Sequence, residues 1–559
     1  MARWCEVRGL RWERVNLLID VAFACDDDGL TPCSDGNVSS EWTWWIVTGK
    51  PGHRIRRPLH VVNGSQSEDS LTLQVNITNA GSRREIPDGE WSIVAFCHGS
   101  PVASVTAAKM SPLDLHNASR TFPYNGSRNS YAVTFSAAQD ATHSLHMTVA
   151  NHNTPPSFSS LQGGLVRRLA RWAFDRGLVQ ACFQSAYTAM RLVLPHRGKK
   201  RILLAPQLRT DLRDNMLALH RRLVERGLDT EFSVKVFPDV PRTSTIATAR
   251  HWLTAVKQFA WADFIFLDDW CDLLMYITPS PRTVITQLWH GGFGFKTVGF
   301  SQFGLPGGPD LNPPHRKYTY SVVGAEGARD QFAESFGIER EAVLPTGVPR
   351  VDDLLDPVRR TEVTERFHDE FPEFTGRRII LFAPTFRGQG SDSAYYPSDL
   401  IDWEALHQWC GDDTAVIVAM HPYVTARMVD DQERRVHLVP NNLRDRIRED
   451  VTGWPVNDLL LMADTLVTDY SSICYEYTYL QRPIVFYAPD EAEYSATRGF
   501  YARLEDVAPG PVVTTFPDLL SALDSNEAAN ERTLRYRQRF CGPADTHNAD
   551  RLIDRVLFH

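Results

Sequence analysis

The sequence has no long apolar run. No stretch of its 559 residues reaches the roughly 18 uncharged apolar positions that a membrane-spanning helix needs. Its first residues, 1–8, contain no apolar segment of the kind that signal peptides carry. We therefore expect a protein that remains inside the cell.

Cysteine motifs and an excess of positive charge are also missing. The nine cysteines are scattered, with no Cys-x-x-Cys pair and no histidine at metal-ligand spacing, which favours a reducing compartment. The 59 Lys and Arg residues are outnumbered by 68 Asp and Glu residues, giving a net charge of −9. This balance argues against a surface that binds nucleic acid as a whole, although it allows a local basic patch.

The composition is that of a folded protein with more than one domain. Hydrophobic residues make up 43% and charged residues 23% of the chain, values close to those of soluble globular proteins. A chain of this length is too long for one hydrophobic core, so two or three domains are expected. We find no internal repeat of the solenoid type.

Residues 1–155 have the pattern of short strands separated by turn residues. The run at 71–77 alternates apolar and polar side chains, as a half-buried strand does. Similar runs follow at 91–96, 131–135 and 145–149. This spacing predicts an antiparallel β-sandwich. No group of charged or aromatic side chains here points to chemistry, so an accessory or packing role is expected.

Residues 156–200 form a basic segment with a helical pattern. In a helix its apolar and basic residues lie on different sides, the first being Leu165, Leu169 and Trp172 and the second Arg167, Arg168 and Arg171. Two interpretations stay open. The segment is either an interfacial helix on anionic lipid, with Trp172 and the three arginines as membrane contacts, or an interdomain helix with solvated arginines.

From residue 201 onward, strand and helix patterns alternate. Near-continuous apolar strands are predicted in two series, at 202–205, 232–237, 264–267 and 284–289, and then at 378–383, 415–420, 465–468 and 483–487. Such strands alternating with helices indicate parallel sheets. We expect an α/β protein with two Rossmann-like halves facing a cleft, the architecture called GT-B, with residues 201–345 in the first half and 346–559 in the second.

Polar residues and glycines gather directly after these strands, where open α/β sheets bind ligands. His290 ends one strand beside Gly291 and Gly292, which would let a substrate approach the backbone. Because an imidazole titrates near neutrality, His290 is a candidate for taking a proton from an alcohol. Lys296 is a candidate for holding a phosphate. A structural histidine is the alternative interpretation.

Three further strand ends carry candidates for binding a diphosphate. Arg387 offers a planar set of donors that matches phosphate oxygens, with a surface salt bridge as the alternative. His421 precedes a proline and could donate to a pyrophosphate, with a structural role equally open. Asp469, Ser471 and Ser472 precede an apolar helix whose start could face an anion, with simple N-capping as the alternative.

Six motifs in a fixed order connect these strand ends. They are Trp289-His290-Gly291 with Lys296 and Gly299, then 347–352, 383–387, His421-Pro422, 468–472, and 482–487 followed by 498–501. In this order they resemble the CDP-glycerol glycerophosphotransferase family, the teichoic acid and capsule polymerases. The resemblance covers residues from about 200 to 502.

The resemblance implies a GT-B fold, a CDP-activated alditol donor, release of CMP, and catalytic roles for His290 and His421. The residues implied in ligand binding are Thr385, Arg387, Thr468, Asp469, Ser471 and Ser472 for the donor, and Gly291, Gly292 and Lys296 for the acceptor or a phosphate. It also implies a protein held at the inner face of the cell membrane, where a lipid-linked acceptor lies.

The expected reaction moves an alditol phosphate, most simply glycerol phosphate, to the terminal hydroxyl of a phosphate polymer. No clustered carboxylates require a metal, and Asp268-Asp269 is interpreted as a turn after a strand; a Mg²⁺ ion carried with the CDP donor stays open. Two rival functions are a GT-B glycosyltransferase using a sugar nucleotide and a non-catalytic scaffold that binds polymer. The sequence leaves open the alditol, the product length and the oligomeric state.

Overall fold

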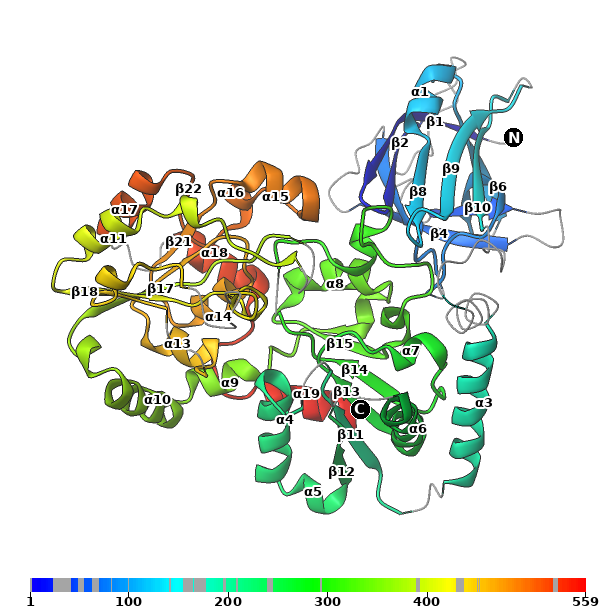
Figure 1. Cartoon of the computed structure of the whole chain (residues 1–559). Helices are drawn as coiled ribbons and strands as arrows, with labels where there is room; N and C mark the ends of the chain where they lie inside the picture. The colour runs from blue at the N-terminus through cyan, green and yellow to red at the C-terminus, as the bar shows by residue number, and fades with distance from the viewer. Residues whose placement is uncertain are drawn as a thin grey trace.

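The computed structural model combines an N-terminal β domain with two α/β halves (Figure 1). It describes residues 3–23, 42–48, 55–62, 70–81, 83–98, 100–139, 142–153, 164, 177–194, 198–207, 210–238, 245–291, 294–388, 393–428, 437–449, 451, 453–525 and 531–558. Several residues singled out in the sequence lie outside these ranges, namely Leu165, Arg167, Arg168, Leu169, Arg171, Trp172 and Gly292.

The N-terminal domain is a sheet that closes on itself. Its strand order is β3-β4-β5-β2-β1-β7-β6-β10-β9-β8, and β3 also pairs with β6. The elements are β1 (Arg3–Glu13), β2 (Asn16–Phe23), β3 (Trp42–Thr48), β4 (Ile55–Val61), β5 (Ser70–Asn76), β6 (Gly89–Cys97), β7 (Ser100–Thr106), α1 (Pro112–Ala118), β8 (Arg120–Tyr124), β9 (Asn129–Ala137) and β10 (Leu145–His152).

This closed ring corrects the expected sandwich of two separate sheets. Strand β6 is long enough to pair with β10 through its first residues and with β7 through its last, while β3 runs along its other edge. Register shifts between Val7 and Gly9 in β1 and between Ala95 and Phe96 in β6 mark bulges, which bend strands. The alternating pattern at 71–77 was correctly assigned to a strand, but closure depends on pairings between distant strands.

The first α/β half contains a six-stranded parallel sheet of order β12-β11-β13-β14-β15-β16. The strands are β11 (Arg201–Ala205), β12 (Ser233–Val236), β13 (Phe264–Leu267), β14 (Val284–Gln287), β15 (Tyr320–Val322) and β16 (Val343–Leu344). The helices around it include α3 (Leu178–Val193), α4 (Asp214–Glu225), α5 (Leu228–Glu231), α6 (Thr245–Trp261), α7 (Leu273–Tyr276) and α8 (Arg329–Phe336), with short 3₁₀ turns at η2 (Gly299–Gln302) and η3 (Pro314–Lys317).

The second half repeats the design with the order β19-β18-β17-β20-β21-β22. Its strands are β17 (Arg378–Phe382), β18 (Thr414–Val418), β19 (Ile447–Arg448), β20 (Thr465–Thr468), β21 (Ile484–Tyr487) and β22 (Val512–Val513). Its helices include α9 (Arg350–Leu355), α10 (Pro357–Glu370), α11 (Trp403–Cys410), α12 (Pro422–Thr425), α13 (Val456–Met462), α14 (Ile473–Tyr479), α15 (Glu491–Arg498), α16 (Leu504–Val507), α17 (Phe516–Ser525) and α18 (Glu531–Phe540).

The chain order in this second sheet reverses between β17 and β20. These strands are neighbours in the sheet, yet the chain leaves β17 toward β18 and later returns to the other side with β20. Such a reversal opens a crevice at the carboxyl ends of the two strands, and ligands of open α/β sheets bind there. Ligand-binding candidates of this half are therefore expected after Phe382 and Thr468.

The last helix, α19 (Asn548–Leu557), returns to the first half. Its side chains Leu552, Ile553 and Val556 pack in one core cluster with Ile202 and Leu204 of β11. The chain thus crosses between the halves twice, once near Gly347 and once between α18 and α19. The two crossing segments are in contact at Gly347. A Cβ atom added there would lie only 1.6 Å from the side-chain oxygen of Asn548, so no larger residue fits.

The N-terminal domain packs firmly on the first half. Phe303, which follows η2, stacks on Phe122 of β8 at 5.7 Å between ring centroids and belongs to the core cluster of the β domain. The buried carboxylate of Glu334 in α8 accepts hydrogen bonds from Arg14 at 2.6 and 3.1 Å and from Ser301 at 2.7 Å. One continuous interface therefore joins the β domain to the segment after β14.

No helix within the described ranges combines the length and the hydropathy needed to cross a membrane.

Candidate functional site

His290 lies just beyond the carboxyl end of β14 on a turn that two amide side chains hold. Trp289 has a φ of +53°, a left-handed conformation that is costly for a bulky residue. Its N–H donates to the side-chain oxygen of Gln287 at 2.9 Å, and its carbonyl accepts from the amide of Asn215 at 2.7 Å. The turn directs His290 outward, with 52% of its side chain exposed and its ring stacked 4.4 Å from that of Trp289.

The carboxylate of Asp269 faces His290. Its Oδ2 lies 3.6 Å from the Nδ1 of His290, within ion-pair range. The backbone carbonyl of Asp269 accepts from the side-chain amide of Gln287 at 2.9 Å, and its Oδ1 accepts from the N–H of Trp270 at 2.7 Å. Gln287 therefore ties the ends of β13 and β14 together, which fixes the spacing between Asp269 and His290. Asp268 and Asp269 form a bend after β13, and the contact of Asp269 with His290 was not predicted from the sequence.

Lys296 lies where the two halves meet. It forms an isolated β-bridge with Phe500, and the neighbouring N–H of Thr297 donates to the carbonyl of Gly499 at 3.0 Å. Two of the motifs found in the sequence are thus paired in space, although about 200 residues separate them. The ammonium group lies 6.0 Å from the ring centroid of Tyr494, and no ion pair to it occurs among the described residues.

The surroundings of Lys296 change its titration. Burial lowers the pKa of Lys296 to about 8; the charge of Asp469 opposes this shift, and Arg498 and Arg387 add to it. A lysine with this pKa is still mostly charged at pH 7 and is held without a fixed partner. It is therefore available to neutralise an anion that enters between the halves.

Asp469 is the centre of the hydrogen-bond network at the β17–β20 crevice. Its Oδ1 accepts from the N–H of Thr385 at 2.8 Å and from the N–H of Tyr470 at 2.6 Å, and also from the hydroxyl of Thr385. Its Oδ2 accepts from Arg387 at 2.9 Å. One buried carboxylate thereby ties the segment after β17 to the segment after β20.

Arg387 is buried, and most of the N–H groups of its guanidinium donate to acidic side chains. Its Nε and one terminal nitrogen donate to the two oxygens of Asp490 at 2.6 and 2.9 Å, and the other nitrogen donates to Asp469 and to the carbonyl of Thr385. Burial alone would lower the pKa of Arg387, but hydrogen bonds and charges from Asp490 and Asp469 raise it above its ordinary value. The guanidinium thus connects the segments that follow β17, β20 and β21.

His421 caps the short helix α12. Its Nδ1 accepts the N–H of Tyr423 at 3.2 Å, so the ring proton of neutral His421 resides on Nε2. The ring packs 4.7 Å from that of Phe386. Burial, together with the nearby Lys296 and His290, lowers the pKa of His421 to about 4, so this side chain is neutral at pH 7 and can donate from Nε2.

The remaining candidates lie along the same crevice. The hydroxyl of Thr468 donates to the carbonyl of Ala383 at 2.7 Å and is buried. Ser471 accepts the N–H of Ile473 at 3.4 Å, whereas Ser472, directly before α14, makes no side-chain capping bond. Both serines are partly exposed, and Gly291 is buried.

The structure therefore brings candidates from both halves into one site. The pKa of His421 responds to the charges of Lys296 and His290, so these three side chains lie within electrostatic range of one another. The charges of Asp469 and Arg387 in turn shift the pKa of Lys296 in opposite directions.

Sequence reasoning missed Asp269 and Asp490, although each follows a strand within a few residues. It also missed the ion pair of Arg350 with Glu476, buried between α9 and α14 at 2.9 Å.

No group of three or more His, Cys, Asp and Glu side chains that could hold a metal occurs in the part of the chain that the structure describes. Lys296, which lies where the two halves meet, offers a diphosphate a cation from the protein itself.

The fold is similar to that of a solved protein, the wall teichoic acid polymerase TagF. The TM-score is 0.52 at 18% identity, and the match covers 71% of this chain and 98% of that one. At this level of identity the likeness concerns the fold alone. It supports a mixed α/β protein with the two parallel sheets described above.

Comparison of sequences identifies the family. The model of the CDP-glycerol:poly(glycerophosphate) glycerophosphotransferase family matches residues 186–558. The chain belongs to this family and is an enzyme of the transferase class. The resemblance inferred from the six motifs is thereby confirmed.

Three curated relatives from Staphylococcus aureus illustrate the similarity. Teichoic acid ribitol-phosphate polymerase TarK is 34% identical over 70% of this chain and 76% of its own length. Teichoic acid ribitol-phosphate polymerase TarL is 38% identical over 53% of this chain and 51% of its own length. Teichoic acid glycerol-phosphate transferase is 29% identical over 59% of this chain and 79% of its own length.

Proposed function

We propose that the chain is a GT-B transferase that moves an alditol phosphate from a CDP-activated donor to the terminal hydroxyl of a teichoic-acid-like polymer, releasing CMP. The observation that carries this proposal is the meeting of His290 from the first half with Lys296 and His421 at the crevice of the second. A base on one side and cationic or N–H donors on the other is what in-line phosphoryl transfer requires.

On the acceptor side, His290 takes the proton of the attacking hydroxyl. The hydroxyl oxygen forms a bond to the β-phosphorus of the donor, while the bond between that phosphorus and the oxygen bridging to the α-phosphate breaks. The electron pair of the broken bond leaves with CMP. Asp269 acts through His290 as a positioning residue, because its carboxylate faces Nδ1 and orients the ring.

On the donor side, neutral His421 donates from Nε2 to the pyrophosphate, and Lys296 neutralises charge that builds up on the leaving group. Thr385, Thr468 and Asp469 shape the crevice, with Ser471 and Ser472 offering hydroxyls at its rim. Arg387 is a positioning residue whose contacts with Asp469 and Asp490 keep this surface in place. Gly291 and Gly292 follow the base and leave room for the acceptor.

A donor panel tests this function. Incubation with CDP-ribitol, CDP-glycerol and UDP-sugars, with an oligomeric alditol-phosphate acceptor, should release CMP from the CDP-alditols only. Among the alditols, ribitol is favoured, since the relatives at 34% and 38% identity are named for ribitol phosphate and the glycerol-phosphate transferase is at 29%. Release of UDP with transfer of a sugar would instead establish the glycosyltransferase alternative, and no transfer would favour the scaffold.

We also propose that the enzyme works as a peripheral protein at the inner membrane face on a lipid-linked acceptor. The basic segment supports this, since three arginines near an anionic surface contribute on the order of 1 kcal/mol each. Changing Arg167, Arg168 and Arg171 to glutamate should lower activity on a lipid-linked acceptor and leave a soluble acceptor unaffected. Equal loss on both acceptors would make the segment an interdomain helix.

A further inference from the structure

Asn215 of α4 joins the turn that carries His290 to the first helix of the second half. Its side-chain amide donates to the carbonyl of Trp289 at 2.7 Å, and its side-chain oxygen accepts the N–H of Arg350 at 3.1 Å. Arg350 is the first residue of α9, so this N–H has no partner within its own helix. Asn215 is only 2% exposed, and both bonds are therefore shielded from water.

An asparagine is the residue type that suits this position. On one side it meets an N–H donor, and on the other it meets two carbonyl oxygens, those of Trp289 and, at 3.4 Å, of Leu288. A side chain with one acceptor and one donor at its tip satisfies both sides. A carboxylate would instead turn an oxygen toward the carbonyl oxygens, and an apolar side chain would leave the buried N–H of Arg350 without this acceptor.

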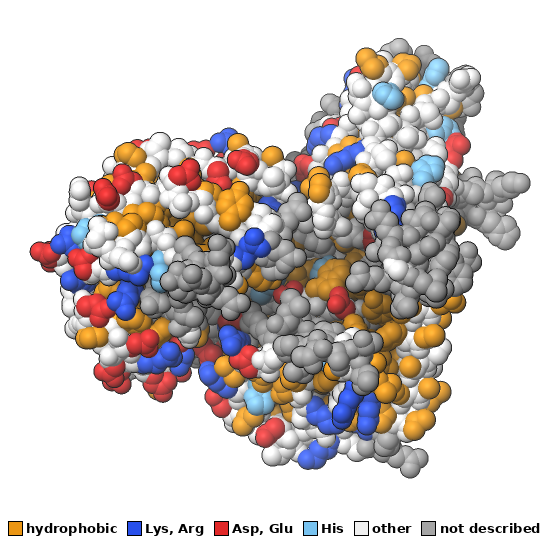
Figure 2. All heavy atoms as spheres, viewed as in Figure 1, with side chains coloured by type: hydrophobic (Ala, Val, Ile, Leu, Met, Phe, Trp, Pro, Cys, Tyr) orange, Lys and Arg blue, Asp and Glu red, His pale blue; other side chains and the backbone are white. Residues whose placement is uncertain are grey.

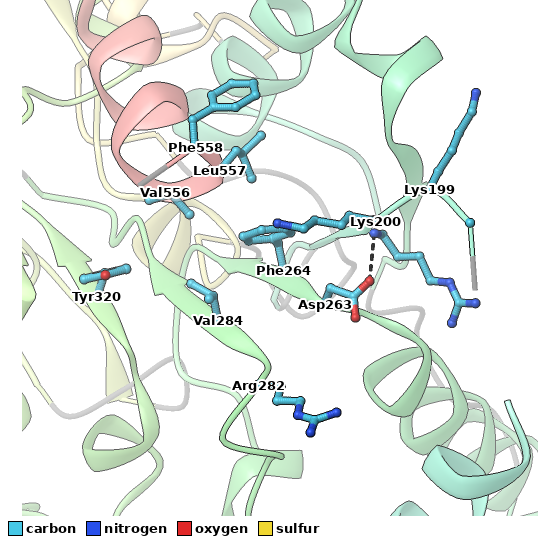
Figure 3. Close-up of a pocket in the computed structure, with 12 residues that line it drawn as sticks. Lys199, Lys200, Asp263, Phe264, Arg282, Val284, Tyr320, Val556, Leu557 and Phe558 are labelled. Atoms are coloured by element: carbon cyan, nitrogen blue, oxygen red, sulfur yellow. Dashed lines mark hydrogen bonds between the residues drawn. The ribbon is translucent and has the colours of Figure 1, made fainter. Parts of the chain in front are cut away.

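The helix that Asn215 contacts is anchored to the first half. Asp352 of α9 accepts two backbone N–H groups at the start of α19, at 2.9 and 2.8 Å. The other end of α19 packs on the first sheet, where Figure 3 shows Leu557 above Phe264 in what is one core cluster. The start of α9 is therefore held in place next to α4.

Arg350 connects the same helix to the donor crevice. Its guanidinium donates to the carboxylate of Glu476 at 2.9 Å, and both side chains are buried. Glu476 lies in α14, about one helical turn after Ser472 at the rim of the crevice. Because breaking a buried ion pair is costly, α9 and α14 move together.

The outer face of this joint contributes less. Figure 2 shows Lys, Arg, Asp and Glu side chains intermixed over α4 and α9. Arg221 and Asp353 form one such pair at 3.1 Å, and 43% and 37% of their side chains are exposed. Exposed ion pairs add little to stability. The buried side chains of Glu476, Arg350 and Asn215 therefore form the firmer connection.

We propose that Asn215 is a positioning residue that makes the placement of His290 depend on the donor-binding half. Buried contacts lead from Glu476 at the crevice through Arg350 to Asn215, and from there to the carbonyl of Trp289. Trp289 has left-handed backbone angles, so its turn relaxes and His290 shifts when this carbonyl loses its donor. The inference rests on the proposed function, because it needs His290 as the base.

A double-mutant cycle tests this role. Asn215→Ala should lower kcat about 10- to 100-fold, because a misplacement of about 1 Å can cost about 100-fold. Its affinity for CMP, measured by calorimetric titration, should not change. In the His290→Ala background, the same substitution should lower the residual single-turnover rate less than about twofold, since no base is left to position. Equal losses in both backgrounds would overturn the proposal. If His290→Ala alone turns over like the parent, the proposed role of His290 as base fails instead.

Two size-conserving variants test the two ends of the connection. Asn215→Asp retains an acceptor for Arg350 and loses the donor to Trp289, so it should give the same result in the cycle, and it takes the place of Asn215→Ala if that variant does not fold. Glu476→Gln removes the charge that holds α9 to α14. It should lower kcat in the parent and leave the kcat of Asn215→Ala unchanged, because both act on the same turn. A parent-like kcat in Glu476→Gln would overturn the dependence on the donor half.

Asn548→Ala is the matched control. Asn548 is as buried as Asn215 and lies at the same joint, but its side-chain amide donates to Asp352 at 2.6 Å rather than to the turn of His290. Its removal should lower thermal stability about as much as Asn215→Ala does and leave kcat within about twofold of the parent. A loss of kcat as large as that of Asn215→Ala would show that any damage to the joint has this effect, and would overturn the proposal.

Discussion

At the scale of single residues, the pair His290 and Asp269 carries the first prediction. His290→Ala should lower turnover by about 100-fold or more, the usual effect of losing a general base, and leave donor affinity largely intact. Asp269→Asn should lower kcat by about tenfold, a smaller loss than that of the base itself. Steady-state kinetics measure turnover and donor affinity in both variants.

Asp272→Asn is the matched control for Asp269→Asn. The carboxylate of Asp272 accepts the indole N–H of Trp270 at 2.9 Å and does not face His290. A kcat for Asp269→Asn equal to that of the parent would show that the carboxylate serves only to hold its turn. Equal loss of donor affinity in His290→Ala would make His290 a donor ligand.

Lys296 should make donor use depend on pH. Its pKa is lowered to about 8, so its charge is present below that pH and is lost as the pH rises through it. The kcat/KM for the donor should therefore fall above about pH 8. Lys296→Arg keeps the charge throughout this range, so the fall should move to higher pH. A basic limb that stays at the same pH in the arginine variant would assign it to another group.

At the scale of elements, the crevice between β17 and β20 depends on Arg387. Removing a side chain that pairs with two carboxylates leaves Asp469 buried without its cation, so Arg387→Ala should reduce the free energy of unfolding by about 3 kcal/mol. It should also weaken donor binding, because Asp469, which anchors Thr385 and Tyr470, loses its cation. Thermal unfolding and calorimetric titration with CMP measure the two effects.

The surface pair Arg503 and Glu505 provides the comparison, since both side chains are more than half exposed and Arg503→Ala should leave stability unchanged. If Arg387→Ala loses donor affinity while its unfolding curve matches that of the parent, Arg387 contacts the phosphate directly and the positioning role is wrong.

Much of this arrangement follows from local patterns. Continuous apolar runs identified four of the six strands in each parallel sheet and missed the short strands β15, β16, β19 and β22. The rule that ligands bind after such strands made His290, His421 and Asp469 candidates. The carboxylate partners were not predictable in the same way. Asp269 and Asp490 also follow strands, but an aspartate there is common in turns, and only the folded chain shows which one faces a histidine or an arginine.

The closed N-terminal ring was beyond sequence reasoning for a related reason. Alternation identifies a strand and its buried face, but not its neighbours. The pairing of β3 with β6 closes the ring, and it depends on bulges and on strands far apart in the chain.

At the scale of the whole molecule, the N-terminal domain and the site share one interface. Phe303 is 2% exposed and packs into the β-domain core, seven residues after Lys296. Phe303→Ala should therefore destabilise the protein by about 3 kcal/mol and lower activity, since the segment that carries Lys296 loses its support. Denaturant unfolding and donor KM measure these effects.

Leu305→Ala is the control from the same segment, because Leu305 is 42% exposed. It should change neither quantity appreciably. Loss of stability in Phe303→Ala with unchanged kinetics would show that the β domain supports the fold without influencing the site.

The two chain crossings near Gly347 and Gly542 determine how the halves can move. A Cβ at Gly542 would lie 2.6 Å from the carbonyl of Gly324 and 3.3 Å from the Cα of Gly347, so both crossings pass through one point. Two halves whose covalent connections pass through one point can rotate about that point, but they cannot translate apart. The β-bridge between Lys296 and Phe500 then holds the closed arrangement. Opening the cleft to exchange CMP for a new donor therefore means breaking the bridge that holds Lys296, the lysine expected to bind the phosphate.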